Sequence, residues 1–145
     1  MANGFNEAAQ LPEIWETEED KLLTIGQLKY RYRQIAKHKF QGKVFTNRDK
    51  NIQIKVSADG IMEWWRKSRK REHIISVQAL DFFLENGVFV EENLDYLERR
   101  KIESASQFKS ICKINGKRYG VNLITRKAIY DIDKFRYFSL KDTDK

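Results

Sequence analysis

The chain has 145 residues, of which 28 are lysine or arginine and 21 are aspartate or glutamate, giving a formal net charge of +7. Its hydrophobic content of 41% is enough to form one core, which excludes a wholly disordered chain, and no apolar run approaches the roughly 20 residues needed to cross a bilayer. The single cysteine excludes an intramolecular disulfide, and because only two histidines accompany it, neither a metal site nor another cofactor is expected. We therefore expect a soluble, cytoplasmic protein that does not bind membranes.

The charge is unevenly distributed along the chain. Residues 1–20 contain six acidic side chains and no basic one, so the rest of the chain holds all 28 basic residues against 15 acidic ones, a net charge of +13. A field of this sign attracts polyanions such as nucleic acid, although the lysine-rich surface of any soluble domain would give the same count. We predict an acidic flexible leader at 1–20, a single folded domain at 21–141 and a disordered tail at 142–145.

Helical and strand periodicities alternate in the first part of the domain. Apolar residues at spacings of three and four predict a helix over 24–39, and alternation predicts two short strands at 44–47 and 52–56. A second helix is expected to start at Asp59, whose carboxylate can accept hydrogen bonds from the first turn, and a third helix is expected over 72–86.

The second part of the domain shows strand patterns only. Strands are predicted at 88–91, 108–114, 118–124 and 129–140, and the pair Asn115-Gly116 predicts a two-residue hairpin turn between two of them. The order of elements indicates an α+β domain in which about three helices pack on an antiparallel sheet of four to six strands.

A basic run directly follows the adjacent tryptophans Trp64 and Trp65. Its five cations at 66–71 could bind phosphates, or they could lie in a solvated loop and complement a helix dipole. The two tryptophans cannot face the same way on a helix, so we expect Trp65, four residues after Ile61, in the core and Trp64 partly exposed for stacking on a base. With the basic stripe of the first helix, the predicted nucleic-acid-binding residues are Arg66, Lys67, Arg69, Lys70, Arg71, Lys29, Arg33, Lys37 and Trp64.

His73 follows the basic run at the start of the third predicted helix. Neighbouring cations would disfavour its protonated form and leave it available as a general base near neutral pH, whereas Glu72 would raise its pKa. A surface or capping role for His73 is the alternative. The position of His38 at a helix end is explained by the helix dipole alone.

The last predicted strand carries cationic, aromatic and hydroxyl side chains. Arg136 and Phe138 share one face of that strand, while Tyr137 and Ser139 share the other. An arginine or lysine there could stabilise a pentacoordinate phosphate, and Tyr137 or Ser139 could orient it. Ordinary decoration of a sheet surface would give the same pattern.

Several short motifs resemble the small domains associated with large polyvalent proteins of phages and conjugative elements. The matching stretches are residues 40–47, 52–56, 59–61 and 114–121 and the helix of His73. Those domains are similar to the barnase, EndoU, colicin and RelE type of nuclease fold. The resemblance covers roughly residues 24–140 and implies helices on an antiparallel sheet, an origin in a mobile genetic element or its bacterial host, and a metal-independent ribonuclease ancestry.

A metal-independent ribonuclease needs a base for the 2′-hydroxyl, an acid for the 5′-leaving oxygen and a cation at the phosphate. We predict His73 as acid or base and Tyr137 or Ser139 as an orienting group. The candidates for the phosphate cation are Lys117, Arg118, Arg126 and Arg136, and those for the second acid or base are Glu63, Glu72 and Glu103.

The competing hypothesis is a binding module that cleaves nothing. Such a module would hold nucleic acid, RNA in preference to DNA, or an acidic protein surface through its basic face. A further hypothesis gives the leader a role, because residues 13–20 could fold back over the basic face and mask it, or dock a partner subunit. Whether the protein is catalytic, and its oligomeric state, are left open by the sequence.

Overall fold

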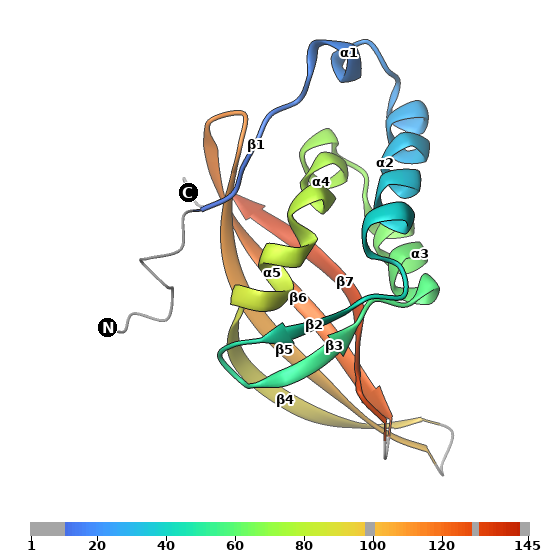
Figure 1. Ribbon diagram of the computed structural model, residues 1–145, viewed down its shortest axis with the longest axis vertical. Coiled ribbons are helices and arrows are strands. Elements are labelled where there is room, and N and C mark those ends of the chain that lie inside the picture. The colour runs from blue at the N-terminus through green and yellow to red at the C-terminus, as the bar shows by residue number, and fades with distance from the viewer. Residues whose placement is uncertain (1–10, 98–100, 129–130, 143–145) are drawn as a thin grey trace.

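Seven strands form one curled sheet in the part of the chain that the computed structural model describes, which is residues 11–97, 101–128 and 131–142 (Figure 1). The strands are β1 (Glu13–Ile14), β2 (Val44–Asn47), β3 (Ile52–Lys55), β4 (Val88–Leu97), β5 (Lys101–Ile114), β6 (Lys117–Ala128) and β7 (Asp133–Asp142). Their order is β1-β5-β6-β7-β3-β2, and β4 also pairs with β5. The sheet is antiparallel except for two short parallel pairs, β1 with β5 and β3 with β7. The expected α+β class is therefore confirmed, whereas the sheet is mixed and has seven strands among the described residues, where an antiparallel sheet of four to six strands was expected.

The long β5–β6 hairpin turns at Asn115-Gly116, as the sequence predicts. Asn115 has φ 51° and Gly116 has φ 81°. Positive φ at both central residues is what a two-residue turn needs in order to match the twist of the flanking strands. The paired strands extend well beyond the predicted bounds, because β5 also pairs with the whole of β4.

The helices lie on one face of the sheet (Figure 1). They are α1 (Glu18–Lys21), α2 (Ile25–Phe40), α3 (Ala58–Lys67), α4 (Arg71–Ile75) and α5 (Leu80–Asn86), with a 3₁₀ turn η1 (Ser76–Ala79) between the last two. The third predicted helix, 72–86, is thus broken into three pieces. Ser76 donates from its hydroxyl to the carbonyl of His73 at 2.8 Å, and such bonds to a preceding carbonyl bend helices.

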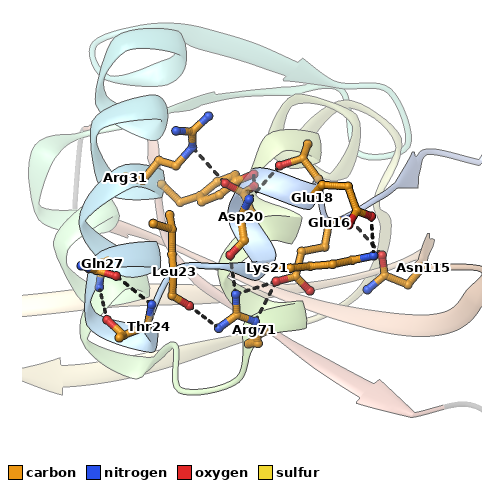
Figure 2. A network of polar contacts seen from close by, with 12 residues as sticks. Glu16, Glu18, Asp20, Lys21, Leu23, Thr24, Gln27, Arg31, Arg71 and Asn115 are labelled. Atoms are coloured by element: carbon orange, nitrogen blue, oxygen red, sulfur yellow. Dashed lines mark hydrogen bonds and ion pairs between the residues drawn. The ribbon is translucent and has the colours of Figure 1, made fainter.

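Side-chain caps set where α2 and α3 begin. Thr24 and Gln27 form a reciprocal capping box at the start of α2, in which each side chain accepts a hydrogen bond from the other residue's backbone N–H (Figure 2). The cap of α3 is Ser57, whose hydroxyl accepts from the N–H of Gly60, and not Asp59 as expected. Asp59 lies inside the first turn instead, where its charge is favourable to the helix dipole.

The helices are fastened to the sheet around Phe138 of β7. Its ring stacks on Trp64 of α3 at 6.4 Å between centroids and meets Phe83 of α5 edge-on at 5.3 Å. All three side chains are fully buried. Aromatic contacts of this kind add to the free energy gained by burying the rings themselves.

Residues 11–20, which the sequence predicts to be a flexible leader, are folded onto the body. The carbonyls of Pro12 and Ile14 accept hydrogen bonds from the N–H groups of Lys113 and Asn115, which makes β1 a short edge strand beside β5. Asp20 at the end of α1 is buried. Residues 1–10 and the predicted tail at 143–145 lie outside the described residues. Among the described helices, none combines the length and the apolar character that a membrane crossing requires.

We predict opposite effects of alanine at two helical glycines. A Cβ on Gly60 would lie 2.1 Å from the carbonyl oxygen of Phe135, because α3 packs directly on β7 there. Gly60→Ala should therefore lower the free energy of unfolding by about 2 kcal/mol or more. A Cβ on Gly26 in α2 would meet nothing within 4 Å, so Gly26→Ala should raise it by up to about 1 kcal/mol.

Urea denaturation followed by circular dichroism measures both free energies. Equal effects of the two substitutions would contradict the close approach of α3 to β7.

Candidate functional site

A cleft of about 480 Å³ lies where the connection from α3 to α4 passes the end of β7 and the start of β6. We call it the His73 cleft. It brings together the predicted residues His73, Tyr137 and Ser139 with three cations of the basic run, namely Lys67, Arg69 and Lys70. Lys117 and Tyr119 of β6, and the acids Glu72 and Asp142, complete its polar lining.

His73 is held against the edge of β7 by its own ring. Its Nε2 lies 2.7 Å from the carbonyl oxygen of Phe138, and the two rings meet edge-on at 4.9 Å. A carbonyl oxygen can only accept, so Nε2 carries the hydrogen and Nδ1 holds the lone pair.

Burial lowers the pKa of His73 to about 4, and the bond to the Phe138 carbonyl opposes this only in part. The imidazole is therefore neutral near pH 7, as expected, but desolvation causes this and not the neighbouring cations. A neutral imidazole can accept a proton at Nδ1, but it has no readily released proton to give to a leaving group.

The cations of the cleft differ in how far they are already paired. Lys117 Nζ lies 2.7 Å from an Asp142 carboxylate oxygen. Lys67 Nζ lies over the Tyr137 ring, 4.6 Å from its centroid. Its ion pair with Glu63 is long, with 3.9 Å between Nζ and the nearest carboxylate oxygen. Within the described residues, neither Arg69 nor Lys70 lies within ion-pairing distance of a carboxylate, and both are exposed. These two are the cations most available to an anion in the cleft.

The two arginines predicted to be catalytic are not among the residues that line the His73 cleft. Arg136 donates from Nε and Nη2 to one Glu63 oxygen, at 2.7 and 2.6 Å. This pair joins β7 to α3 and engages both the arginine and the candidate acid Glu63. Arg118 is exposed on β6, and Arg126 lines a separate cavity together with Arg136. The side chain of Glu103 lies outside the described residues.

Arg71, predicted to bind nucleic acid, instead fastens residues 16–23 to the body (Figure 2). Its guanidinium donates to the Glu16 carboxylate at 2.7 and 2.6 Å and to the carbonyls of Asp20 and Leu23 at 2.6 and 2.9 Å. These contacts use the planar, multiple-donor geometry of arginine, which a lysine could not replace. The buried Asp20 carboxylate in turn pairs with Arg31 at 3.1 Å.

The orientation expected for the two tryptophans is wrong. Trp64 is fully buried against Phe138, so it is not available for stacking on a base. Trp65 is half-buried against α2, where its indole N–H donates to the carbonyl of Lys29 at 3.2 Å. The overlooked signal is Gly60, because the side of α3 that carries a glycine can approach the sheet most closely, and Trp64 lies one turn further on that side.

The remaining predicted cations are not among the residues that line the His73 cleft. Lys29 and Arg33 of α2 lie over the Trp65 ring, at 4.7 and 4.9 Å from its centroid. Lys37 and Arg66 are exposed. The predicted nucleic-acid-binding residues therefore divide between the cleft, the α2–α3 surface and the structural role of Arg71.

Comparison with known families gives one finding. The family model described as large polyvalent protein-associated domain 3 matches residues 24–137, which is most of the chain. Comparisons with curated proteins and with solved structures gave no match. The expected association with polyvalent proteins is thus confirmed, while the likeness to the barnase, EndoU, colicin and RelE type of nuclease fold stays a prediction.

The buried His73 predicts a specific loss of stability in mild acid. Its pKa is about 4 in the folded protein and 6.5 in an unfolded chain, so the unfolded state binds more protons between these values. The stabilisation is complete above about pH 6.5 and is lost as the pH falls toward 4, by up to about 3 kcal/mol. His73→Gln, which removes the titrating group, should flatten the dependence of unfolding free energy on pH in this window.

Urea denaturation of both proteins at several pH values gives the comparison, because carboxylates titrate alike in both. His38→Gln is the matched control, since His38 is exposed, and it should leave the dependence unchanged. A His73→Gln protein that loses stability as steeply as the unaltered chain would show that His73 is not neutral in the fold.

Proposed function

We propose that this chain, which belongs to the large polyvalent protein-associated domain 3 family, binds single-stranded nucleic acid in the His73 cleft, RNA in preference to DNA. The observation that carries the proposal is that cations and aromatic rings line the same cleft. Lys67, Arg69 and Lys70 come from the basic run, and Tyr119 and Tyr137 come from the neighbouring strands. Phosphate-binding cations beside stacking rings are the usual means of holding a single strand.

The polar groups of the cleft support a preference for RNA. Ser139 and Glu72 are among the residues that line the cleft together with the cations. Both can accept a hydrogen bond from a 2′-hydroxyl, which is the group that distinguishes RNA from DNA. A duplex presents its bases stacked and paired, so it would gain little from the tyrosines.

Membership of the family indicates the kind of protein in which this binding would take place. A domain associated with large polyvalent proteins would act in a protein of a mobile genetic element or of its bacterial host, as the resemblance of the sequence motifs implies. An acidic protein surface could meet the same cations, but it would make no use of the two tyrosines for base stacking.

A metal-independent ribonuclease is a second candidate function, because His73, Tyr137 and Ser139 line one cleft. In that reaction a base removes the proton of the 2′-hydroxyl, the 2′-oxygen attacks phosphorus, and the 5′-oxygen leaves with a proton from an acid. His73 could serve as the base through Nδ1. Of the predicted candidates for the acid, Glu72 lines the cleft, whereas Glu63 is engaged by Arg136.

Binding is tested with a labelled single strand of about 12 nucleotides by fluorescence anisotropy, between about 50 and 200 mM salt. Lys70→Ala should weaken binding roughly fivefold and should reduce the slope of log affinity against log salt by about 0.7, because one phosphate contact is lost. Lys43→Ala, an equal change of charge at an exposed residue outside the cleft, is the matched control and should have little effect.

The competitor identifies the class of ligand. Unlabelled RNA should displace the probe better than DNA of the same sequence, and both should do so better than polyglutamate of equal charge. Equal displacement by polyglutamate would favour an acidic protein partner. No binding by the unaltered chain at low salt would overturn the proposal.

Cleavage is tested on the same RNA in the presence of EDTA. Products with 2′,3′-cyclic phosphate ends that disappear with His73→Gln, while binding persists, would establish the ribonuclease. Intact RNA under conditions in which it is fully bound would eliminate that candidate and leave the binding function.

A further inference from the structure

A second group of cations gathers on the surface between α2 and α3, which we call the Trp65 cluster: Lys29, Arg33, Trp65 and Arg69. Lys29 and Arg33 are four residues apart on α2, so they project from the same side of the helix. Both lie over the Trp65 ring, at 4.7 and 4.9 Å from its centroid. The ring is fixed in place by the hydrogen bond from its indole N–H to the Lys29 carbonyl.

The Trp65 cluster lacks the acidic partners that other cations of this surface have. Within the described residues, none of Lys29, Arg33 and Arg69 lies within ion-pairing distance of a carboxylate. Arg31 of the same helix, by contrast, pairs with the buried Asp20. Lys29 and Arg33 share the Trp65 ring, which offsets a small part of their mutual repulsion.

Burial and the like charge of Arg69 act in the same direction on the pKa of Lys29. Partial burial and the charge of Arg69 both lower the pKa of its ammonium group. A nearby anion would relieve this interaction, since it would offset the like charges that the fold holds together. A fold that holds like charges around a fixed ring, without a carboxylate within ion-pairing distance among the described residues, is suited to an external anion.

Arg69 connects this cluster with the His73 cleft. It lines the cleft, and it also lies close enough to Lys29 to influence its pKa. Residues 66–70 of the basic run thus connect the Trp65 cluster with the His73 cleft. A strand bound in the cleft could therefore continue over Arg69 onto the face of α2.

We propose that the Trp65 cluster is a second phosphate-binding site, which takes a backbone phosphate of the same single strand that the His73 cleft holds. Lys29 and Arg33 bind the phosphodiester, and Trp65 holds their side chains in place and does not stack on a base. This inference rests on the proposed function. It makes affinity depend on the length of the strand, because a short oligonucleotide fills the cleft without reaching the cluster.

The test compares RNA of about 3 and about 12 nucleotides. Lys29→Ala and Arg33→Ala should each weaken binding of the long RNA roughly fivefold and reduce its salt slope by about 0.7, while the affinity for the short RNA stays within about twofold. Trp65→Leu should act in the same way, and Trp65→Phe, which keeps a ring under the cations, should retain most of the affinity. Thermal unfolding checks that each variant is folded.

The matched control is Lys39→Ala, which removes an exposed cation of the same helix that lies over the Phe40 ring. It should leave the affinity for the long RNA nearly unchanged. An equal loss with Lys39→Ala would show a diffuse attraction by the whole helix and would overturn the second site.

The outcomes separate this inference from the proposed function. If Lys70→Ala weakens both RNAs while Lys29→Ala and Arg33→Ala weaken neither, the cleft binds RNA and the second site is wrong. If the unaltered chain binds neither RNA, both proposals fail.

Discussion

The packing of Phe138 between the helices and the sheet is the constraint on which the candidate site depends. Its ring contacts Trp64, Phe83 and Phe135, and its carbonyl accepts the hydrogen bond of His73. The short helix α4 thereby covers one point on the edge of β7. Beyond this point the strand continues to Asp142, and Ser139, Leu140 and Asp142 line the cleft. The contacts that stabilise the core thus also position His73 and Phe138, which both line the cleft.

Some cations of the folded domain pair with carboxylates, whereas others, such as Arg69 and Lys70, have no carboxylate within ion-pairing distance among the described residues. Glu16 pairs with Arg71 and Asp20 pairs with Arg31. The ion pairs that hold the acidic segment to the fold therefore compensate the charge of these two arginines. The bonds of Arg71 are to partly buried groups, where charge-assisted hydrogen bonds are worth more than on an exposed surface. Within the described residues 11–20, the acids pair with particular arginines, and none of these residues is among those that line the His73 cleft.

Local signals in the sequence predicted the local features of the fold. The Asn115-Gly116 turn needs only two residues that tolerate positive φ, and the face of α2 follows from its spacing of apolar residues. The grouping of His73 with Tyr137 and Ser139 could be anticipated from their chemistry. Contacts between distant parts of the chain could not: nothing in residues 11–20 shows that they pair with β5, and the roles of Trp64 and Arg71 depend on elements far away in sequence.

Because His73 is neutral and hydrogen-bonded, the cleft meets fewer of the requirements for RNA cleavage than for RNA binding. Its Nε2–H is already used by the Phe138 carbonyl, and burial keeps the ring neutral, so only Nδ1 could take part in proton transfer. Cleavage would then require a separate acid in the right place, and the Asp142 carboxylate is already paired with Lys117. Phosphate binding requires none of these conditions, because lysine and arginine are charged throughout the neutral range. The cleft therefore has the components for holding a strand, whereas a catalytic role would also require Glu72 to supply the proton of the leaving group.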